Sequence, residues 1–422
     1  MGRMANRATR IRPVNATPAP TPGGMRHGRL SVFGLADYRR LWLIGTVSSV
    51  VRWLDTLAMA VFAYQATGSA FVVAMLTMLR MLPMAVLGLV FGAVGERVER
   101  RLLLFGVLVA MALTSTALAA LAWAGQLAVW HLAVASLLNG MAWASDNTVR
   151  RFLIGEVVGA ARLSAALSLD IGAGNAARLL GPVLGGALLA VVGIEGAFAL
   201  GALLYLPPML AAWHLAYRNP HVASGGPALL ARIAGGFGVV RRDPRLLGTM
   251  VVTLIFNLWG WPATSMVPVI GADQLGLSPP MIGLLAGMDG LGALASAAAL
   301  AMLLRPGGYR ATYVGGTALY LAATVAFALS PDPVSAAVAL IVTGAASSCF
   351  GVMQSTLVYV LAPPEARSRV FGVLAVCIGS APIGFLHLGL LADWIGAPYA
   401  TALIGIQGLI ALLLTRRWWR TI

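Results

Sequence analysis

Charged residues inside long hydrophobic segments are the part of this sequence most able to carry chemistry. They comprise three acids and three arginines: Asp55, Asp170, Asp289, Arg52, Arg80 and Arg178. An ionised side chain at the centre of a bilayer costs at least about 2.5–3.5 kcal/mol, so such residues usually pair with one another or carry protons. Their equal numbers allow complete mutual neutralisation. We therefore treat these residues as candidates for proton coupling, with a purely structural role in orienting helices as the alternative.

Depth within the segments suggests which charges meet. Asp55 and Arg80 each lie about ten residues, or ~15 Å of helix, from the same end of consecutive segments, which predicts an ion pair. Arg52 is a competing partner because it lies three residues before Asp55. Asp170 lies near the opposite end of its segment, within reach of Arg150–Arg151. Stabilisation of that end is the favoured role for Asp170, and proton loading is the alternative.

The segments that position these charges have the composition of membrane-spanning helices. Of the 422 residues, 59% are hydrophobic and 10% are charged, which is too little polar surface for a soluble protein of this size. Apolar runs of roughly 20 residues recur along the whole chain. We predict an all-α polytopic membrane protein with twelve transmembrane helices near residues 41–65, 70–94, 102–124, 128–146, 164–191, 196–217, 246–271, 280–304, 311–329, 334–361, 370–392 and 397–415.

The arginines predict how these helices are oriented. The net charge is +15, the chain contains no lysine, and all but three arginines fall in the tails or in alternate connections. Positive residues accumulate on the cytoplasmic side of membrane proteins, so both termini are expected in the cytoplasm of a bacterium, with the helices in its inner membrane. This pattern argues against a nucleic-acid partner, which a strongly basic soluble protein would suggest.

The domain organisation follows from the same pattern. We expect a disordered basic tail over residues 1–35, a six-helix bundle over 36–218, a cytoplasmic linker over 219–245, a second six-helix bundle over 246–415 and a short cytoplasmic tail over 416–422. A shift of 209 residues aligns Leu76 with Leu285 and Arg101 with Arg310, which fits two related halves. The linker alternates apolar and basic residues, so it is either an interfacial helix or an unstructured basic connection.

Two motifs resemble signatures of the major facilitator superfamily. The stretch from 92 to 101 resembles its loop signature between the second and third helices, which implies an inner gate formed by Gly92, Glu96, Arg97, Arg100 and Arg101. The stretch from 177 to 186 resembles the GxxxGPxxGG signature of the antiporter branch, with an alanine at the first glycine position, through Ala177, Gly181, Pro182, Gly185 and Gly186. Small residues of this kind let helices approach closely.

Shorter stretches resemble the exporter branch of this superfamily, which includes enterobactin and macrolide efflux proteins. They are Asp37–Trp42, Arg52–Asp55 and Asp146–Asn147. The resemblance implies two pseudosymmetric six-helix bundles that alternate access to a central cavity. Because the fifth and eighth helices pack together in that arrangement, Arg178 and Asp289 are expected to form a bridge between the halves. The fourth helix lacks the central arginine of many drug antiporters.

The resemblance also implies which residues face the substrate. Candidate contacts on the first, fourth, seventh and tenth helices are Trp53, Asn139, Trp143, Asn257, Trp259, Trp261 and Gln354. A few polar groups among aromatic ones suit an amphipathic ligand. We expect a monomeric transporter, not an enzyme, that exports a small hydrophobic or amphipathic compound, drug-like or siderophore-like, in exchange for protons. A facilitator or importer, or a polytopic membrane enzyme or sensor, is the alternative.

No cofactor or metal is expected. The glycine-rich stretch Gly235–Gly238 lacks the lysine of a phosphate-binding loop. The histidines lie on separate segments without a nearby nucleophile, and the two cysteines have no ligand spacing.

Overall fold

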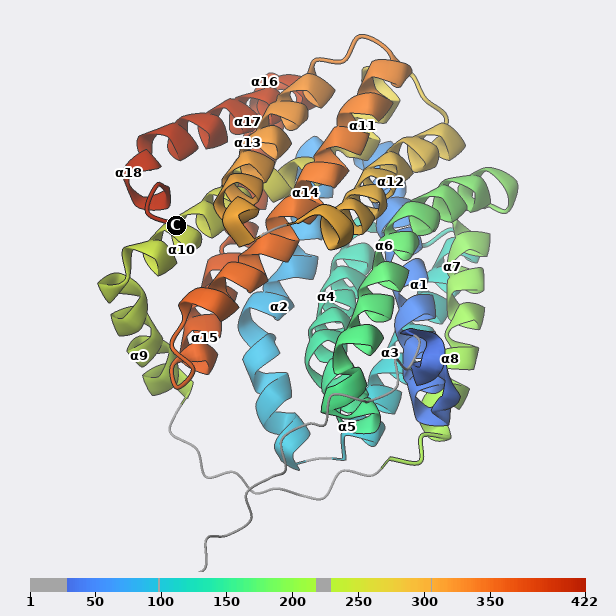
Figure 1. Cartoon of the computed structure of the whole chain (residues 1–422). Helices are drawn as coiled ribbons and strands as arrows, with labels where there is room; N and C mark the ends of the chain where they lie inside the picture. The colour runs from blue at the N-terminus through green and yellow to red at the C-terminus, as the bar shows by residue number, and fades with distance from the viewer. Residues whose placement is uncertain (1–28, 98, 218–228, 305) are drawn as a thin grey trace, which may run out of the picture.

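The structure is built from helices (Figure 1). It is a computed structural model that describes residues 29–97, 99–217, 229–304 and 306–422, without the side chains of 29–30, 84–97, 147–148, 160–161, 229–234 and 306. Within these ranges no residue lies in a β-strand. Ten helical segments of the described chain are long and apolar enough to cross a membrane.

The amino-terminal half, coloured blue to green in Figure 1, lies beside the carboxy-terminal half, coloured yellow to red. Its elements are η1 (Arg29–Gly34), α1 (Ala36–Thr67), α2 (Ala70–Arg97), α3 (Arg100–Trp123), α4 (Val129–Ser145), η2 (Asp146–Arg150), α5 (Arg151–Val158), α6 (Ala160–Val191), α7 (Gly193–Leu204) and α8 (Leu206–Trp213). The carboxy-terminal half contains α9 (Leu229–Arg242), α10 (Pro244–Ile255), η3 (Phe256–Gly260), η4 (Trp261–Met266), α11 (Val267–Asp273), α12 (Pro279–Leu303), η5 (Pro306–Gly308), α13 (Tyr309–Ala328), α14 (Pro333–Leu361), α15 (Arg367–Ile378), α16 (Ala381–Ile395), α17 (Ala397–Leu414) and α18 (Arg416–Trp419).

Each predicted segment coincides with one helix or with consecutive helices, while the count of twelve crossings stays a prediction. α4 has 17 residues and the apolar stretch of α2 is Ala70–Pro83, so both are shorter than the helices counted as long enough to cross a membrane.

Prolines explain where predicted single helices break, because proline lacks an N–H donor and clashes with the preceding turn. The sixth segment breaks at Tyr205, just before two prolines, and the eleventh breaks before Pro382. The seventh passes through a π-helix and a 3-10 helix around Pro262.

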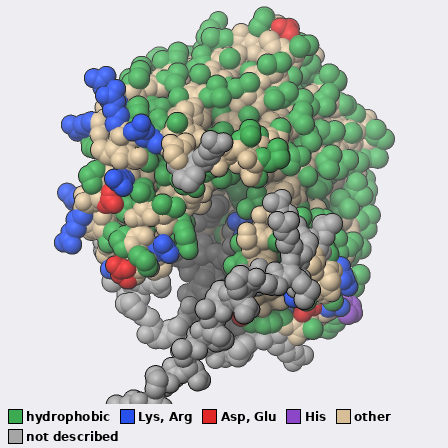
Figure 2. All heavy atoms as spheres, in the orientation of Figure 1, with side chains coloured by type: hydrophobic (Ala, Val, Ile, Leu, Met, Phe, Trp, Pro, Cys, Tyr) green, Lys and Arg blue, Asp and Glu red, His purple; other side chains and the backbone are tan. Residues whose placement is uncertain are grey.

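The outer surface is apolar, as lipid requires. Leu113 is 64% exposed, and Trp394 is 82% exposed. The face in Figure 2 shows hydrophobic side chains over most of its upper and right-hand parts, with basic side chains along its left and lower margins. Since water would penalise so much exposed apolar area, the solvent of this surface is the hydrocarbon of a bilayer.

The two halves repeat one another in detail. Arg101 donates a hydrogen bond to the carbonyl of Leu215 at 2.9 Å, and Arg310 donates one to the carbonyl of Arg420 at the same distance. In each half a basic side chain at the start of the third helix thus binds backbone just beyond the sixth. This correspondence fits the predicted offset of 209 residues.

The segments predicted as tails and linker carry more structure than expected. Residues 1–28 lie outside the described chain, but the tail predicted over 1–35 is wrong at its end, because 29–34 form a 3-10 helix and Val32 is 1% exposed. The linker contains the helix α9, as the first of its two interpretations expected. At the carboxyl end α18 is held by Trp419, whose indole donates to the carbonyl of Leu412 at 2.7 Å.

The two ends of the molecule differ in their arginine content. The arginine-poor end comprises the connections at residues 68–69, 124–128, 274–278 and 329–332. The arginine-rich end comprises the described connecting residues 99, 146–162, 214–217, 229–245, 304, 306–310 and 362–366. Tyr64 of α1 donates a hydrogen bond to Asp273 of α11 at the arginine-poor end. The two halves therefore touch through a polar contact at that end.

Candidate functional site

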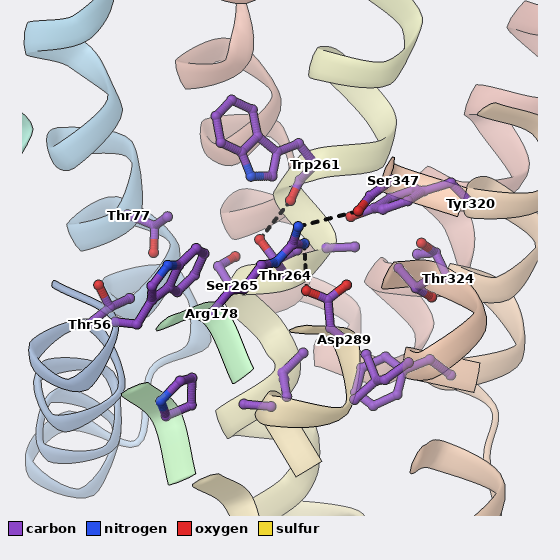
Figure 3. Close-up of a pocket in the computed structure, with 18 of the residues that line it drawn as sticks. Thr56, Thr77, Arg178, Trp261, Thr264, Ser265, Asp289, Tyr320, Thr324 and Ser347 are labelled. Atoms are coloured by element: carbon purple, nitrogen blue, oxygen red, sulfur yellow. Dashed lines mark hydrogen bonds and ion pairs between the residues drawn. The ribbon is translucent and has the colours of Figure 1, made fainter. Parts of the chain in front are cut away.

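A cavity of about 380 Å³ lies between the two halves. Both halves line it, the first with α1, α2, α4 and α6 and the second with η3, η4 and α11 to α15. The residues that line it are mostly aromatic, aliphatic or hydroxyl-bearing (Figure 3). A mostly apolar pocket with a few polar groups has the usual character of a small-molecule site.

An ion pair crosses this cavity from one half to the other. Arg178 of α6 lies with its Nη2 atom 2.5 Å from Oδ2 of Asp289 on α12, and its Nη1 atom donates to Ser347 of α14 at 3.3 Å (Figure 3). The side chains are 20% and 12% exposed, so little water screens the pair. The predicted contact between the halves is thus formed.

Glycines bring α6 and α12 into backbone contact beside this pair. A Cβ added at Gly186 would lie 2.5 Å from the carbonyl oxygen of Pro279, and one added at Gly283 would lie 3.0 Å from the Cα of Gly186. Neither space admits a methyl group. The motif has a second face, because Gly181 and Gly185 pack in the same manner on Trp53 and Leu54 of α1. Ala177 is 1% exposed, and Pro182 lines the cavity.

The predicted pair between Asp55 and Arg80 is wrong. Asp55 faces Gly201 and Ser115 inside the amino-terminal half, and its Oδ1 atom has no hydrogen-bond partner among the described residues. The cause is rotation about the helix axis: α1 presents Trp53 and its i+3 and i+4 neighbours to the cavity, and Asp55 falls near the opposite face. Equal depth therefore did not bring the two charges together.

Arg80 instead lies in the cavity among aromatic rings. Its guanidinium donates a hydrogen bond to Thr56, a residue that the sequence had not singled out, and its Cζ atom lies 5.8 Å from the ring centre of Trp53 and 5.9 Å from that of Trp143. It is 7% exposed. Thr56 could have been found from its spacing of three residues from Trp53, which puts both on one helical face.

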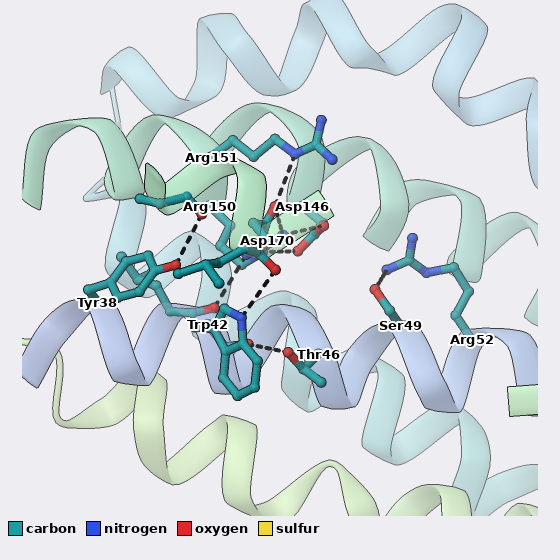
Figure 4. A network of polar contacts seen from close by, with 12 residues as sticks. Tyr38, Trp42, Thr46, Ser49, Arg52, Asp146, Arg150, Arg151 and Asp170 are labelled. Atoms are coloured by element: carbon teal, nitrogen blue, oxygen red, sulfur yellow. Dashed lines mark hydrogen bonds and ion pairs between the residues drawn. The ribbon is translucent and has the colours of Figure 1, made fainter. Parts of the chain in front are cut away.

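Arg52 and Asn139 lie in a separate small pocket inside the amino-terminal half. That pocket also contains Asp146 and Tyr205. Arg52 donates to Ser49 at 3.4 Å (Figure 4). It does not pair with Asp55, which excludes the competing intrahelical contact as well. Asn139 is thus not among the cavity-lining residues, contrary to expectation.

The other candidate substrate contacts divide in the same way. Those that line the cavity are Trp53, Trp143, Asn257, Trp261 and Gln354. Trp259 does not, because it lies two residues from both Asn257 and Trp261 and so points to another side, where it packs in the core of the carboxy-terminal half. Ser347 and Tyr320 line the cavity without having been predicted, because hydroxyl groups and a tyrosine in apolar helices give no signal of direction.

Asp170 forms the predicted contact with both neighbouring arginines. Its Oδ1 atom lies 2.5 Å from Nη1 of Arg150 and its Oδ2 atom lies 3.5 Å from Nε of Arg151, while Asp146 also binds Arg150 (Figure 4). Arg150 is 3% exposed. This cluster at the arginine-rich end is fully engaged, which fits the structural role that we favoured for Asp170.

Only part of the predicted gate is described. The side chains of Gly92, Glu96 and Arg97 lie outside the described part of the structure. Arg100 lies 3.6 Å above the ring of Phe152, and Arg101 binds the backbone beyond α8 as described above. The contacts of these two arginines thus lie within the amino-terminal half.

Known proteins with these features are membrane transporters. A protein named "Uncharacterized MFS-type transporter YfiS" from Bacillus subtilis (strain 168) is 26% identical over 383 residues, which cover 87% of this chain and 90% of that protein. Macrolide efflux protein A of Streptococcus pyogenes is 21% identical over 373 residues, which cover 86% of this chain and 91% of that protein. MFS stands for the major facilitator superfamily.

Solved structures show the same fold. A bacterial homolog of the human lysosomal transporter spinster, in an inward-facing and unoccupied conformation, superposes with a TM-score of 0.68 at 14% identity, covering 94% of this chain and 98% of that one. A POT family transporter in complex with 5-aminolevulinic acid superposes with a TM-score of 0.73 at 12% identity, covering 89% of this chain and 95% of that one. The family model described as "Transmembrane secretion effector" matches residues 28–419. The chain therefore belongs to the transmembrane secretion effector family of the major facilitator superfamily and is a multi-pass membrane transporter.

Proposed function

We propose that this transporter exports a small hydrophobic or amphipathic compound from the cytoplasm in exchange for protons. The observation that carries the proposal is the cavity between the halves, crossed by the ion pair of Arg178 and Asp289. A contact that joins the two halves stabilises the state in which they touch, and weakening the contact favours the state in which they are separated. Protonation of Asp289 would weaken this contact.

The direction of transport is proposed from charge and from similarity. We assign the arginine-rich end, both termini included, to the cytoplasm of a bacterial inner membrane. The halves are joined by backbone contact between α6 and α12 and by the bond from Tyr64 to Asp273, both toward the arginine-poor end. These contacts support a state closed to the outside. A relative that is an efflux protein supports export, and the apolar cavity supports a drug-like or siderophore-like substrate.

Asp55 is our candidate for a second proton site. It is 5% exposed and pairs with no arginine among the described residues, so its charge is not compensated as that of Asp170 is. Acidic side chains inside membrane helices often act in proton relays. Such a group can bind a proton in one state and release it when water reaches it in the other. We also propose that one chain suffices, because the cavity is built from a single copy.

Everted membrane vesicles acidified inside by respiration test the proposal. Addition of a substrate from a panel of amphipathic compounds should release protons and raise the internal pH, and the response should vanish with Asp289→Asn in a well-inserted protein. Flux that follows only the gradient of the compound itself would instead indicate a facilitator. Silence across a broad panel would contradict the proposal.

A further inference from the structure

The charges in the cavity do not balance. Two guanidinium groups line it, those of Arg80 and Arg178, and one described carboxylate, that of Asp289. Asp289 is already engaged by Arg178 at 2.5 Å. The formal charge of the described lining is therefore +1, and the cation without a carboxylate is Arg80.

Arg80 is held in a way that leaves it ready to bind an anion. It is 7% exposed, its Nε atom has no hydrogen-bond partner among the described residues, and its single described bond goes to the neutral hydroxyl of Thr56. The rings of Trp53 and Trp143 lie 5.8 and 5.9 Å from its Cζ atom and attract the positive charge without neutralising it. Asp55, the nearest acid along α1, is turned into the helical bundle. A buried guanidinium that lacks a carboxylate is costly unless a ligand supplies one.

The opposite wall suits an aromatic or apolar body. Phe256 and Phe350 stack with ring centres 3.7 Å apart, and Phe256 also contacts Tyr320 at 4.6 Å. All three line the cavity from the carboxy-terminal half. Thr56, next to Arg80 on the amino-terminal half, lies across the cavity from Tyr320 in Figure 3.

We propose that the substrate is an amphipathic organic anion whose acidic group binds Arg80 between Trp53 and Trp143, while its apolar body lies against Phe256, Phe350 and Tyr320. This inference rests on the transport function proposed above and names its substrate class. Arginine presents two parallel donors to a carboxylate, which makes the contact selective as well as strong. A cationic amphiphile would meet like charge at the same place.

The test measures binding to the purified full-length protein with three matched probes. They are naphthalene-1-acetate, naphthalene-1-acetamide and 2-(naphthalen-1-yl)ethylamine, which share one ring system and differ in charge. Isothermal titration should show the acid binding about tenfold more tightly than the amide, as expected when a charged partner replaces a neutral one, and the amine binding most weakly. Equal affinity of acid and amide, or no saturable binding of the acid, would overturn the proposal without any variant.

Variants assign the preference to one side chain. Arg80→Gln should reduce the ratio of acid to amide affinity to about one, whereas Arg80→Lys should keep part of it because the charge remains without the paired donors. Arg52→Gln is the matched control, since Arg52 also lies near Trp143, at 5.4 Å, but not among the cavity-lining residues. It should keep the tenfold ratio. A ratio that survives Arg80→Gln would refute the assignment.

Failure of this inference and of the proposed function can be told apart. Selective binding of the acid without proton-linked flux in vesicles would keep the anion site and contradict the exchange mechanism. Proton-linked export of neutral or cationic compounds alone, with no preference for the acid, would keep the exchange mechanism and contradict the anion site.

Discussion

Substituting alanine for Gly186 should open the arginine-poor end of the transporter. The added Cβ would lie 2.5 Å from the carbonyl oxygen of Pro279, about 0.8 Å inside the shortest usual carbon–oxygen contact of about 3.3 Å. Because Pro279 begins α12, the clash falls on the contact between the two halves. Overpacking of this kind costs about 1–3 kcal/mol, and the separated state does not carry that cost. The ratio of open to closed molecules should therefore rise by between about 5-fold and about 150-fold.

Labelling of an engineered cysteine measures this shift. Ala60 lines the cavity on α1 and is 8% exposed, so Ala60→Cys, in a background without Cys349 and Cys377, should react slowly with a membrane-impermeant maleimide added outside cells. Gly186→Ala should accelerate the reaction at least about fivefold. Gly174→Ala is the matched control, because Gly174 lies on the same helix and, apart from the adjacent backbone of that helix, no described atom lies within 4 Å of the added methyl group. Equal rates in the two variants would refute the packing argument.

Further variants probe the ion pairs and one tyrosine. Asp170→Asn should lower the free energy of unfolding by about 3 kcal/mol, because Arg150, 3% exposed, loses one of its two carboxylates; an unchanged thermal midpoint in detergent would contradict this. Asp289→Asn and Arg178→Gln should each lower the free energy of unfolding by more than the double variant does, because each single variant leaves one buried charge unpaired. A double-mutant cycle should give a coupling free energy of about 0.5–3 kcal/mol, and effects that simply add would exclude a direct pair. Burial, and then the hydrogen bond to Glu156, raise the pKa of Tyr217, so the contact should stabilise the fold below the tyrosine pKa of about 10 and be lost as the pH rises above it. The difference in thermal midpoint between the parent and Tyr217→Phe should shrink in strong alkali, and a difference independent of pH would contradict this reading.

Sequence reasoning succeeded where position along a helix decides the outcome. The contact from Asp170 to Arg150 was predicted from depth, because a rise of about 1.5 Å per residue converts position into height in the membrane. The contact from Arg178 to Asp289 was predicted from depth together with the helix packing that the family resemblance implies. The helices themselves followed from apolar runs of the right length. The family resemblance, rather than depth, indicated the seven candidate substrate contacts, of which five line the cavity.

Sequence reasoning failed where rotation about a helix axis decides the direction in which a side chain points. Asp55 has the depth to meet Arg80 but the wrong direction, since a residue two places from the cavity-facing Trp53 is turned by about 200°. Trp259 is misplaced for the same reason, and the π-helix and 3-10 helix around it shift the helical phase in a way that no periodic pattern reports. Lipid-facing helices are apolar on every side, so the hydrophobic pattern that marks the inner face of a soluble helix is missing.

The measurement that tests alternating access most directly is a pair of distances across the two ends of the same protein. Spin labels at Gln126 and Pro331 report on the arginine-poor end, and labels at Ser164 and Ser368 report on the arginine-rich end, all exposed positions in opposite halves. When the pH of the reconstituted protein is changed from acidic to alkaline, the first distance and the second should change in opposite senses, and Asp289→Asn should suppress both changes. Two distances that stay fixed, or that respond to pH equally in the Asp289→Asn variant, would contradict a proton-controlled motion of the two halves about the cavity.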